Sequence, residues 1–191
     1  YYGTDAGSVP RTEADGPGEG FLAEVCDAWE HAANVDGVRS VHIRTGLALS
    51  SAGGLLPVLK ASVNAGLTAQ FGRGDFWMSW VALDDLTDFY VRALLDETVS
   101  GPVNATAPEP VTNAEMSAAL ARLLHRQDLF PIPSFGPKLL LGEEGAHELA
   151  LADQRVLPTV AAEHGWRLRY PTLDAALRHE LGREQLLVSQ A

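Results

Sequence analysis

Residues 72–113, GRGDFWMSWVALDDLTDFYVRALLDETVSGPVNATAPEPVTN, decide the fold class of this chain. They predict a strand over 77–83, an amphipathic helix, a Gly-Pro turn, a second strand over 103–107 and a second helix that runs to about 125. Because strands alternate with helices, the segment indicates α/β architecture.

Two polar signals predict where these helices begin. Asp84 or Asp85 is a natural N-cap for the first helix. Thr112 and Glu115 have the spacing of a capping box for the second, in which each side chain satisfies a free backbone N–H of the other. The helical spacing also predicts a buried face on the first helix, made of Leu86, Phe89, Tyr90, Ala93 and Leu94.

The same patterns outline the rest of the chain. The segment 4–20 predicts a loop, since Gly, Pro and acidic residues recur in it without periodicity. An apolar stripe of Phe21, Leu22, Val25, Cys26 and Trp29 predicts a helix over 20–33. Further elements are expected in this order: a strand over 38–44, a helix over 55–67, a Pro-rich stretch, a helix over 135–152, another helix, a turn at Gly165, a short exposed strand, and a last helix capped by Thr172.

Composition excludes several classes of function. The 191 residues suffice for one domain or slightly more, and the formal charge of −11 argues against a nucleic-acid partner, which requires clustered basic residues. No apolar run is long enough to span a membrane. A single cysteine, Cys26, excludes an internal disulfide framework and predicts a reducing, cytoplasmic location.

Several long segments resemble one known family. They are Tyr1-Tyr2-Gly3 followed by FLAEVCDAWE at 21–30, RTGLALSSAGGLLP at 44–57, WMSWVALDDL at 77–86, QRVLP at 154–158 and RYPTLDAAL at 169–177. Together they resemble an atypical subgroup of the extended short-chain dehydrogenase/reductases. This subgroup is NAD-dependent epimerase/dehydratase-like and carries a C-terminal domain of unknown function.

The resemblance implies a partial Rossmann fold, with a substrate-binding subdomain and an α-rich C-terminal extension. No strand–GxxGxxG–helix pattern is found. Gly16, Gly18 and Gly20 alternate ahead of a helix, but no β-rich run precedes them. The expectation is therefore that the N-terminal strands of the parent fold lie upstream of Tyr1, and that this chain is a fragment.

The expected division of the chain follows the resemblance. The segments are 1–49 (Rossmann domain), 50–75 (substrate-binding segment), 76–108 (a strand–helix–strand return to the Rossmann core), 109–140 (substrate-binding subdomain) and 141–191 (domain of unknown function).

The catalytic pair of the family is absent from the expected place. Ordinary members use Tyr-x-x-x-Lys, in which the lysine lowers the tyrosine pKa for proton transfer. Alignment through Glu30 puts Leu22 and Cys26 at those positions. Glu24 and Cys26 are then the candidate catalytic residues, against the alternatives of a solvated carboxylate and a small core residue.

The candidate cofactor-binding residues are Tyr2, Arg44, Thr45 and Gly46. The last three follow a predicted strand end, where α/β folds bind ligands. The resemblance implies that this loop passes the nicotinamide side of NADP(H), and that Tyr2 lies near the cofactor. The alternatives are that the arginine only caps the strand and that the tyrosine only packs.

The candidate substrate-binding residues are Arg73, Trp77 and Trp80. Enzymes of this branch commonly carry an arginine on the corresponding strand to bind a substrate diphosphate, but Met78 stands there. The flanking tryptophans favour a flat or apolar metabolite, and Arg73 could replace the missing cation from the preceding loop. Alternatively, both tryptophans fill the core.

Together these observations predict an NADP(H)-dependent oxidoreductase or epimerase-like protein that acts on an unknown small molecule. The alternative is a non-catalytic, nucleotide-responsive binding module that has lost its proton-transfer pair. The chain alone is expected to bind dinucleotide weakly or not at all and to use no metal. By analogy, it is a possible homodimer through the helix over 20–33.

Overall fold

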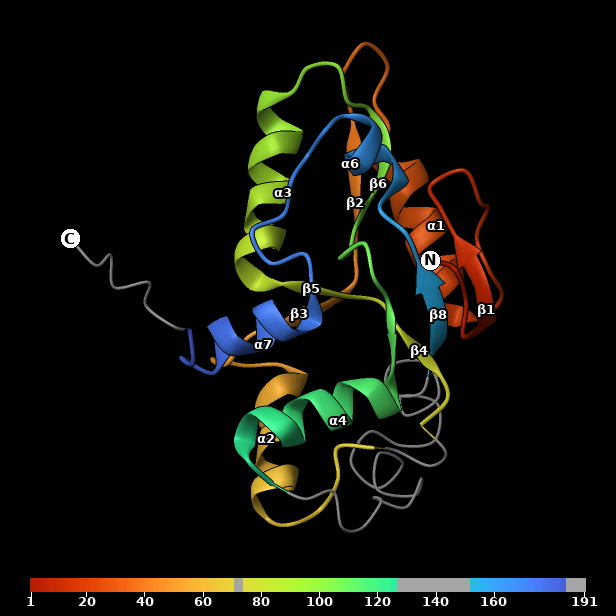
Figure 1. The fold of residues 1–191 in the computed structure, drawn as a ribbon. Coiled ribbons are helices and arrows are strands. Elements are labelled where there is room, and N and C mark those ends of the chain that lie inside the picture. The colour runs from red at the N-terminus through yellow and green to blue at the C-terminus, as the bar shows by residue number, and fades with distance from the viewer. Residues whose placement is uncertain (71–73, 127–151, 185–191) are drawn as a thin grey trace, which may run out of the picture.

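The computed structural model describes residues 1–70, 74–126 and 152–184. The chain folds into mixed α/β architecture, so the predicted fold class is confirmed (Figure 1). The elements are β1 (Asp5–Arg11), α1 (Phe21–Ala33), β2 (Val41–Thr45), β3 (Leu47–Leu49), α2 (Leu55–Asn64), β4 (Trp77–Met78), β5 (Trp80–Ala82), α3 (Leu83–Leu95), β6 (Gly101–Ala105), β7 (Val111–Thr112), α4 (Asn113–Leu124), β8 (Asp153–Val156), α6 (Thr159–Glu163) and α7 (Leu173–Glu180).

Parallel strand pairs form the centre of the fold. β2 runs parallel to β6, from Val41 opposite Gly101 to Thr45 opposite Ala105, and β3 runs parallel to β5. In Figure 1, α3 and α1 lie on opposite sides of β2 and β6. Because β2 and β6 are parallel, their carboxyl ends lie together, and this edge carries the site described below.

The strand β1 corrects the predicted loop over 4–20. It pairs in parallel with β8, and the register shifts on either side of Gly7. Glycine and proline disfavour strands, so the local sequence gives no strand signal. The pairing depends on a partner about 150 residues away, which local patterning does not detect. The remaining pair, β4 with β7, is antiparallel.

Two groups of buried side chains hold these elements together. One gathers α2, α4 and α7 around Trp80 and Leu120, which are both fully buried. The other joins α3, β6 and α6, where Phe89 and Trp166 meet edge to face with ring centroids 5.8 Å apart. Among the described helices, none is both long and apolar enough to cross a membrane.

The helix α1 has the predicted bounds, but its apolar stripe is not buried. Phe21 is 68% exposed and Trp29 is 70% exposed. Within α1 only Ala23 is buried. The predicted helix over 55–67 is also confirmed as α2, which ends at Asn64.

The start of α3 corrects the predicted N-cap. The helix begins at Leu83 after Ala82, and neither aspartate caps it. Asp85 is buried instead, where its carboxylate accepts backbone N–H bonds from Arg169 at 2.6 Å and Tyr170 at 3.0 Å. The acidic side chain therefore anchors a distant segment rather than its own helix.

Only part of the predicted face of α3 is buried. Phe89 and Ala93 are buried, whereas Tyr90 is 50% exposed and Leu94 is 75% exposed. The prediction relied on helical spacing alone, and the apolar stripe that it gave is wider than the part of α3 that neighbouring elements cover.

The C-terminal part is confirmed in one place and corrected in another. Thr172 caps α7 by accepting the backbone N–H of Ala175 at 3.4 Å. The exposed strand expected after Gly165 does not form, because Trp166 turns inward and its indole N–H donates to Asp96 at 3.4 Å. The helix predicted over 135–152 falls almost entirely outside the described residues.

The predicted capping box is confirmed and gives a direct test of local stability. The Thr112 hydroxyl accepts the Glu115 backbone N–H at 3.3 Å, and the Glu115 carboxylate accepts the Thr112 N–H at 2.7 Å. We expect Thr112→Ala to lower the free energy of unfolding by about 1 kcal/mol. Thr87→Ala, at an exposed position within α3, is the control. Equal unfolding temperatures for Thr112→Ala and the unaltered chain would contradict this account.

Candidate functional site

A pocket of about 510 Å³ opens at the carboxyl ends of β2 and β6. Its walls are mainly aromatic and aliphatic. These apolar lining residues are Tyr1, Trp29, Ile43, Leu47, Leu55, Phe76, Trp77, Met78 and Val156. Ligands of α/β proteins commonly bind at this edge of the sheet.

Arg44, on β2, is the centre of the polar wall. Its Nε and Nη2 donate to the two oxygens of Glu30, each at 2.7 Å, and its Nη1 donates to the Tyr2 hydroxyl at 2.8 Å. The guanidinium also stacks on Tyr1, with Cζ 3.4 Å from the ring centroid. Burial disfavours the charge, but the bonds to Glu30 and Tyr2 outweigh it and hold the pKa of Arg44 above its ordinary value.

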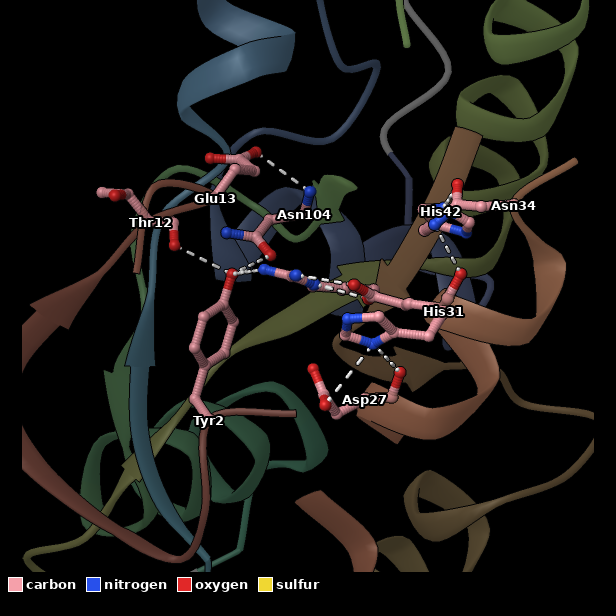
Figure 2. Close-up of polar contacts among 10 residues, drawn as sticks. Tyr2, Thr12, Glu13, Asp27, His31, Asn34, His42 and Asn104 are labelled. Atoms are coloured by element: carbon pink, nitrogen blue, oxygen red, sulfur yellow. Dashed lines mark hydrogen bonds and ion pairs between the residues drawn. The ribbon is translucent and has the colours of Figure 1, made fainter. Parts of the chain in front are cut away.

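Tyr2 links this arginine to the second strand of the pair. Its hydroxyl lies 2.8 Å from Asn104 Oδ1 and 2.9 Å from the Thr12 carbonyl oxygen, and either oxygen can accept a hydrogen bond from it (Figure 2). The side chain is only 5% exposed. Burial raises the pKa of Tyr2, although the hydrogen bonds from Arg44 and to Asn104 oppose the shift, so Tyr2 is a neutral phenol near neutral pH.

The raised pKa of Tyr2 predicts how stability depends on alkaline pH. A group with a raised folded-state pKa contributes stability below the unfolded value, 10.0 for tyrosine, and loses it as the pH rises through the folded value. We therefore expect the free energy of unfolding to fall above about pH 10, and to fall less steeply in Tyr2→Phe. Urea unfolding at several pH values measures this difference. Parallel pH profiles for the two proteins would refute the expectation.

Glu13 holds the far side of the network. Its carboxylate accepts backbone N–H bonds from Asn104 at 2.9 Å, Thr159 at 3.1 Å and Val160 at 3.2 Å. Figure 2 shows Glu13 beside Asn104, on the side away from His31. One carboxylate thus ties β6 to the start of α6, and it fixes the residue that orients Tyr2.

Two glycines allow close backbone approach at the site. A Cβ atom at Gly46 would lie 2.8 Å from both the Ser79 carbonyl oxygen and a Thr106 methyl carbon. A Cβ atom at Gly18 would lie 2.2 Å from the Tyr2 carbonyl oxygen. Both glycines are therefore required by packing, and Gly18 holds the loop before α1 against Tyr2.

The structure brings six of the predicted site residues to this pocket. They are Tyr2, Cys26, Arg44, Thr45, Gly46 and Trp77. Glu24 is exposed and is absent from the pocket wall. Trp80 is fully buried in the core, where its indole N–H donates to the Glu109 carbonyl at 3.0 Å. Arg73 lies outside the described residues, and all these roles stay predictions.

Sequence reasoning missed Glu13, Glu30 and Asn104 as parts of the site. Asn104 carried a usable signal, because an amide inside the strand predicted over 103–107 needs hydrogen-bond partners if that strand is buried. The structure buries it completely. Glu13 sits in a loop without periodicity, and the partner of Glu30 lies on another element, so neither carried a local signal. Within the described ranges, no cluster of three His, Cys, Asp or Glu side chains is placed to hold a metal ion.

Comparison with known proteins agrees with this fold. Residues 132–180 match the domain of unknown function DUF1731. The chain is 45% identical to the nucleoside-diphosphate sugar epimerase of Corynebacterium glutamicum, with a TM-score of 0.80, covering 98% of this chain and 36% of that one. The human epimerase family protein SDR39U1, solved with NADPH, is 29% identical with a TM-score of 0.85, covering 93% of this chain and 61% of that one.

Similarity also extends to curated proteins. An epimerase family protein of Mycobacterium bovis is 38% identical over 180 residues, which are 93% of this chain and 59% of that protein. Fold and site therefore define a Rossmann-like α/β chain with a pocket at the strand ends. More narrowly, the resemblance to the atypical extended short-chain dehydrogenase/reductases with a C-terminal domain of unknown function is confirmed.

Proposed function

We propose that the protein binds NADP(H), with the nicotinamide ring in the pocket beside Arg44, and acts on a small, uncharged, partly aromatic metabolite as an oxidoreductase or epimerase-like enzyme. The observation that carries this proposal is the pocket at the carboxyl ends of two adjacent parallel strands. The NADPH in the structure of human SDR39U1 supports it. Because the chain spans only 59% of its M. bovis relative, the activity of a whole protein is part of the proposal.

The residues of the pocket fit the nicotinamide end of such a cofactor. A flat ring suits walls made by Trp77, Phe76 and Tyr1. Thr45 and Gly46 border the pocket at the end of β2. NADPH supplies a hydride to an acceptor carbon when it is bound.

The proton-transfer chemistry favours a second candidate function. The Tyr2 hydroxyl is occupied by Arg44 and by Asn104 or Thr12, and its raised pKa keeps it protonated and makes it a weak acid. Cys26 is the one predicted catalytic side chain that borders the pocket. If Cys26 does not transfer a proton, the protein is a nucleotide-responsive binding module. Turnover separates the two: NADPH oxidation with aromatic aldehydes that Cys26→Ala abolishes favours the enzyme, and binding without turnover favours the module.

Ligand titration tests the cofactor assignment. We expect reduced nicotinamide mononucleotide and NADPH to change tryptophan fluorescence in a saturable way, with weak affinity on the order of 1 mM. We expect no response to 2′,5′-ADP, which carries the adenine half alone. The change should diminish in Trp77→Phe, at the pocket wall, and persist in Trp166→Phe, in the core beside Phe89. Equal binding of 2′,5′-ADP, or no response to either nicotinamide ligand, would overturn the assignment.

A further inference from the structure

The two charged side chains in the pocket wall neutralise each other. Among the described residues that line the pocket, Arg44 and Glu30 are the two charged side chains, and they bind each other through both carboxylate oxygens. We infer that Glu30 determines specificity: by holding the Arg44 guanidinium in the wall, it makes the pocket select uncharged planar ligands and reject carboxylates and phosphates. This inference rests on the proposed function, since it concerns the ligand class of the same pocket.

The geometry shows why Arg44 does not serve as an anion site. Its side chain is 9% exposed and that of Glu30 is 18% exposed. One edge of the guanidinium faces Glu30, Nη1 faces the Tyr2 hydroxyl, and Tyr1 covers one face. A bidentate pair of this kind is stronger than neutral hydrogen bonds.

An anion that approached Arg44 would have to displace the Glu30 carboxylate or lie beside it. Displacement leaves a half-buried negative charge without its partner, which is costly. An anion that lies beside the Glu30 carboxylate is repelled by its negative charge. The Arg44–Glu30 pair therefore makes binding of an anion unfavourable. Specific sites commonly contain interactions of this kind, which disfavour the wrong ligand.

The rest of the wall favours planar neutral groups. Phe76, Trp77 and Met78 present apolar surface, and Trp29 adds a second aromatic ring. The polar side chains beside them are uncharged, and the Ser79 hydroxyl is already bonded to the Gln154 carbonyl and to the Val156 N–H. Such a wall favours burial of a flat, apolar body.

Three ligands of equal shape and different charge test the inference. They are benzamidine (positive), benzamide (neutral) and benzoate (negative), titrated by tryptophan fluorescence into the full chain with its terminal amine acetylated. The acetyl group removes the ammonium charge next to Tyr1. For the unaltered chain we expect benzamide to bind most tightly. Benzoate binding as tightly as benzamide would overturn the inference.

Two reciprocal variants sharpen the test. Glu30→Gln frees the positive charge and should shift the benzoate-to-benzamide affinity ratio about tenfold towards benzoate. Arg44→Gln frees the negative charge and should shift the benzamidine-to-benzamide ratio about tenfold towards benzamidine. If one variant does not fold, as judged by circular dichroism, the other decides. Unchanged ratios in a folded variant would overturn the inference.

A matched control separates this local effect from net charge. Asp36→Asn removes the same charge as Glu30→Gln at an exposed site in the loop after α1, and it should leave all three affinity ratios unchanged. An equal shift in Asp36→Asn would assign the effect to overall charge and sink the inference. The nicotinamide titration is independent of these ratios, so failure of the cofactor proposal and failure of this inference are distinguishable.

Discussion

Replacing Gly18 by alanine is expected to displace Tyr2 and to lower the free energy of unfolding by about 3 kcal/mol. The added Cβ would lie 2.2 Å from the Tyr2 carbonyl oxygen, 2.3 Å from its carbonyl carbon and 2.5 Å from the Gly3 nitrogen. All three are backbone atoms, so no side-chain rotation relieves the overlap. The loop must move away from Tyr2, which weakens the bonds of its hydroxyl to Arg44 and Asn104.

Gly16→Ala is the matched control for this prediction. Gly16 lies in the same loop, and a Cβ there would meet no atom within 4 Å. Its φ is not positive, so alanine adds no backbone strain. Urea unfolding of both variants measures the difference. A loss in Gly16→Ala as large as that in Gly18→Ala would show that the contact with Tyr2 is not responsible.

Replacing Glu13 by glutamine is expected to cost about 3 kcal/mol. The carboxylate accepts N–H bonds from Asn104, Thr159 and Val160. An amide has one acceptor oxygen and presents N–H groups where the other bonds were made, so at least one donor loses its partner. Hydrogen bonds to a charged acceptor are also stronger than those to a neutral one.

The control for this change is Glu163→Gln. Glu163 is the last residue of α6 and is exposed, so the substitution removes the same charge near the same helix without breaking the three bonds. Thermal unfolding distinguishes the variants. Similar melting temperatures for Glu13→Gln and Glu163→Gln would contradict the role assigned to Glu13.

Local patterning predicted the elements that depend on their own residues. The capping box at Thr112 and Glu115, the bounds of α1 and the cap of α7 at Thr172 all follow from neighbouring side chains. Local patterning failed where the structure of a segment depends on contacts with residues far away in the sequence. β1 forms only because β8 pairs with it, and Asp85 is buried because Arg169 and Tyr170 need an acceptor.

The sequence predicted the position of the candidate site better than it predicted the hydrogen bonds and ion pair within it. A strand end after Arg44 marks the edge of a parallel sheet, and the pocket lies there. The ion pair between Glu30 and Arg44 could not be predicted, because it depends on how closely α1 and β2 pack. The sequence spacing does not show this distance. Trp77 and Trp80 look alike in sequence, yet Trp77 borders the pocket and Trp80 is fully buried. The two residues lie on different strands, β4 paired with β7 and β5 paired with β3.

The most direct test of the central claim is an amide spectrum of the ¹⁵N-labelled chain, recorded as reduced nicotinamide mononucleotide is added. If the pocket at the ends of β2 and β6 holds the nicotinamide ring, the amide signals of Thr45, Gly46 and Asn104 should shift together with one saturation curve. Signals from α7, such as Ala176 in the core, should stay in place. Saturable shifts confined to residues away from the pocket, or no shifts at Thr45 and Gly46, would contradict the account.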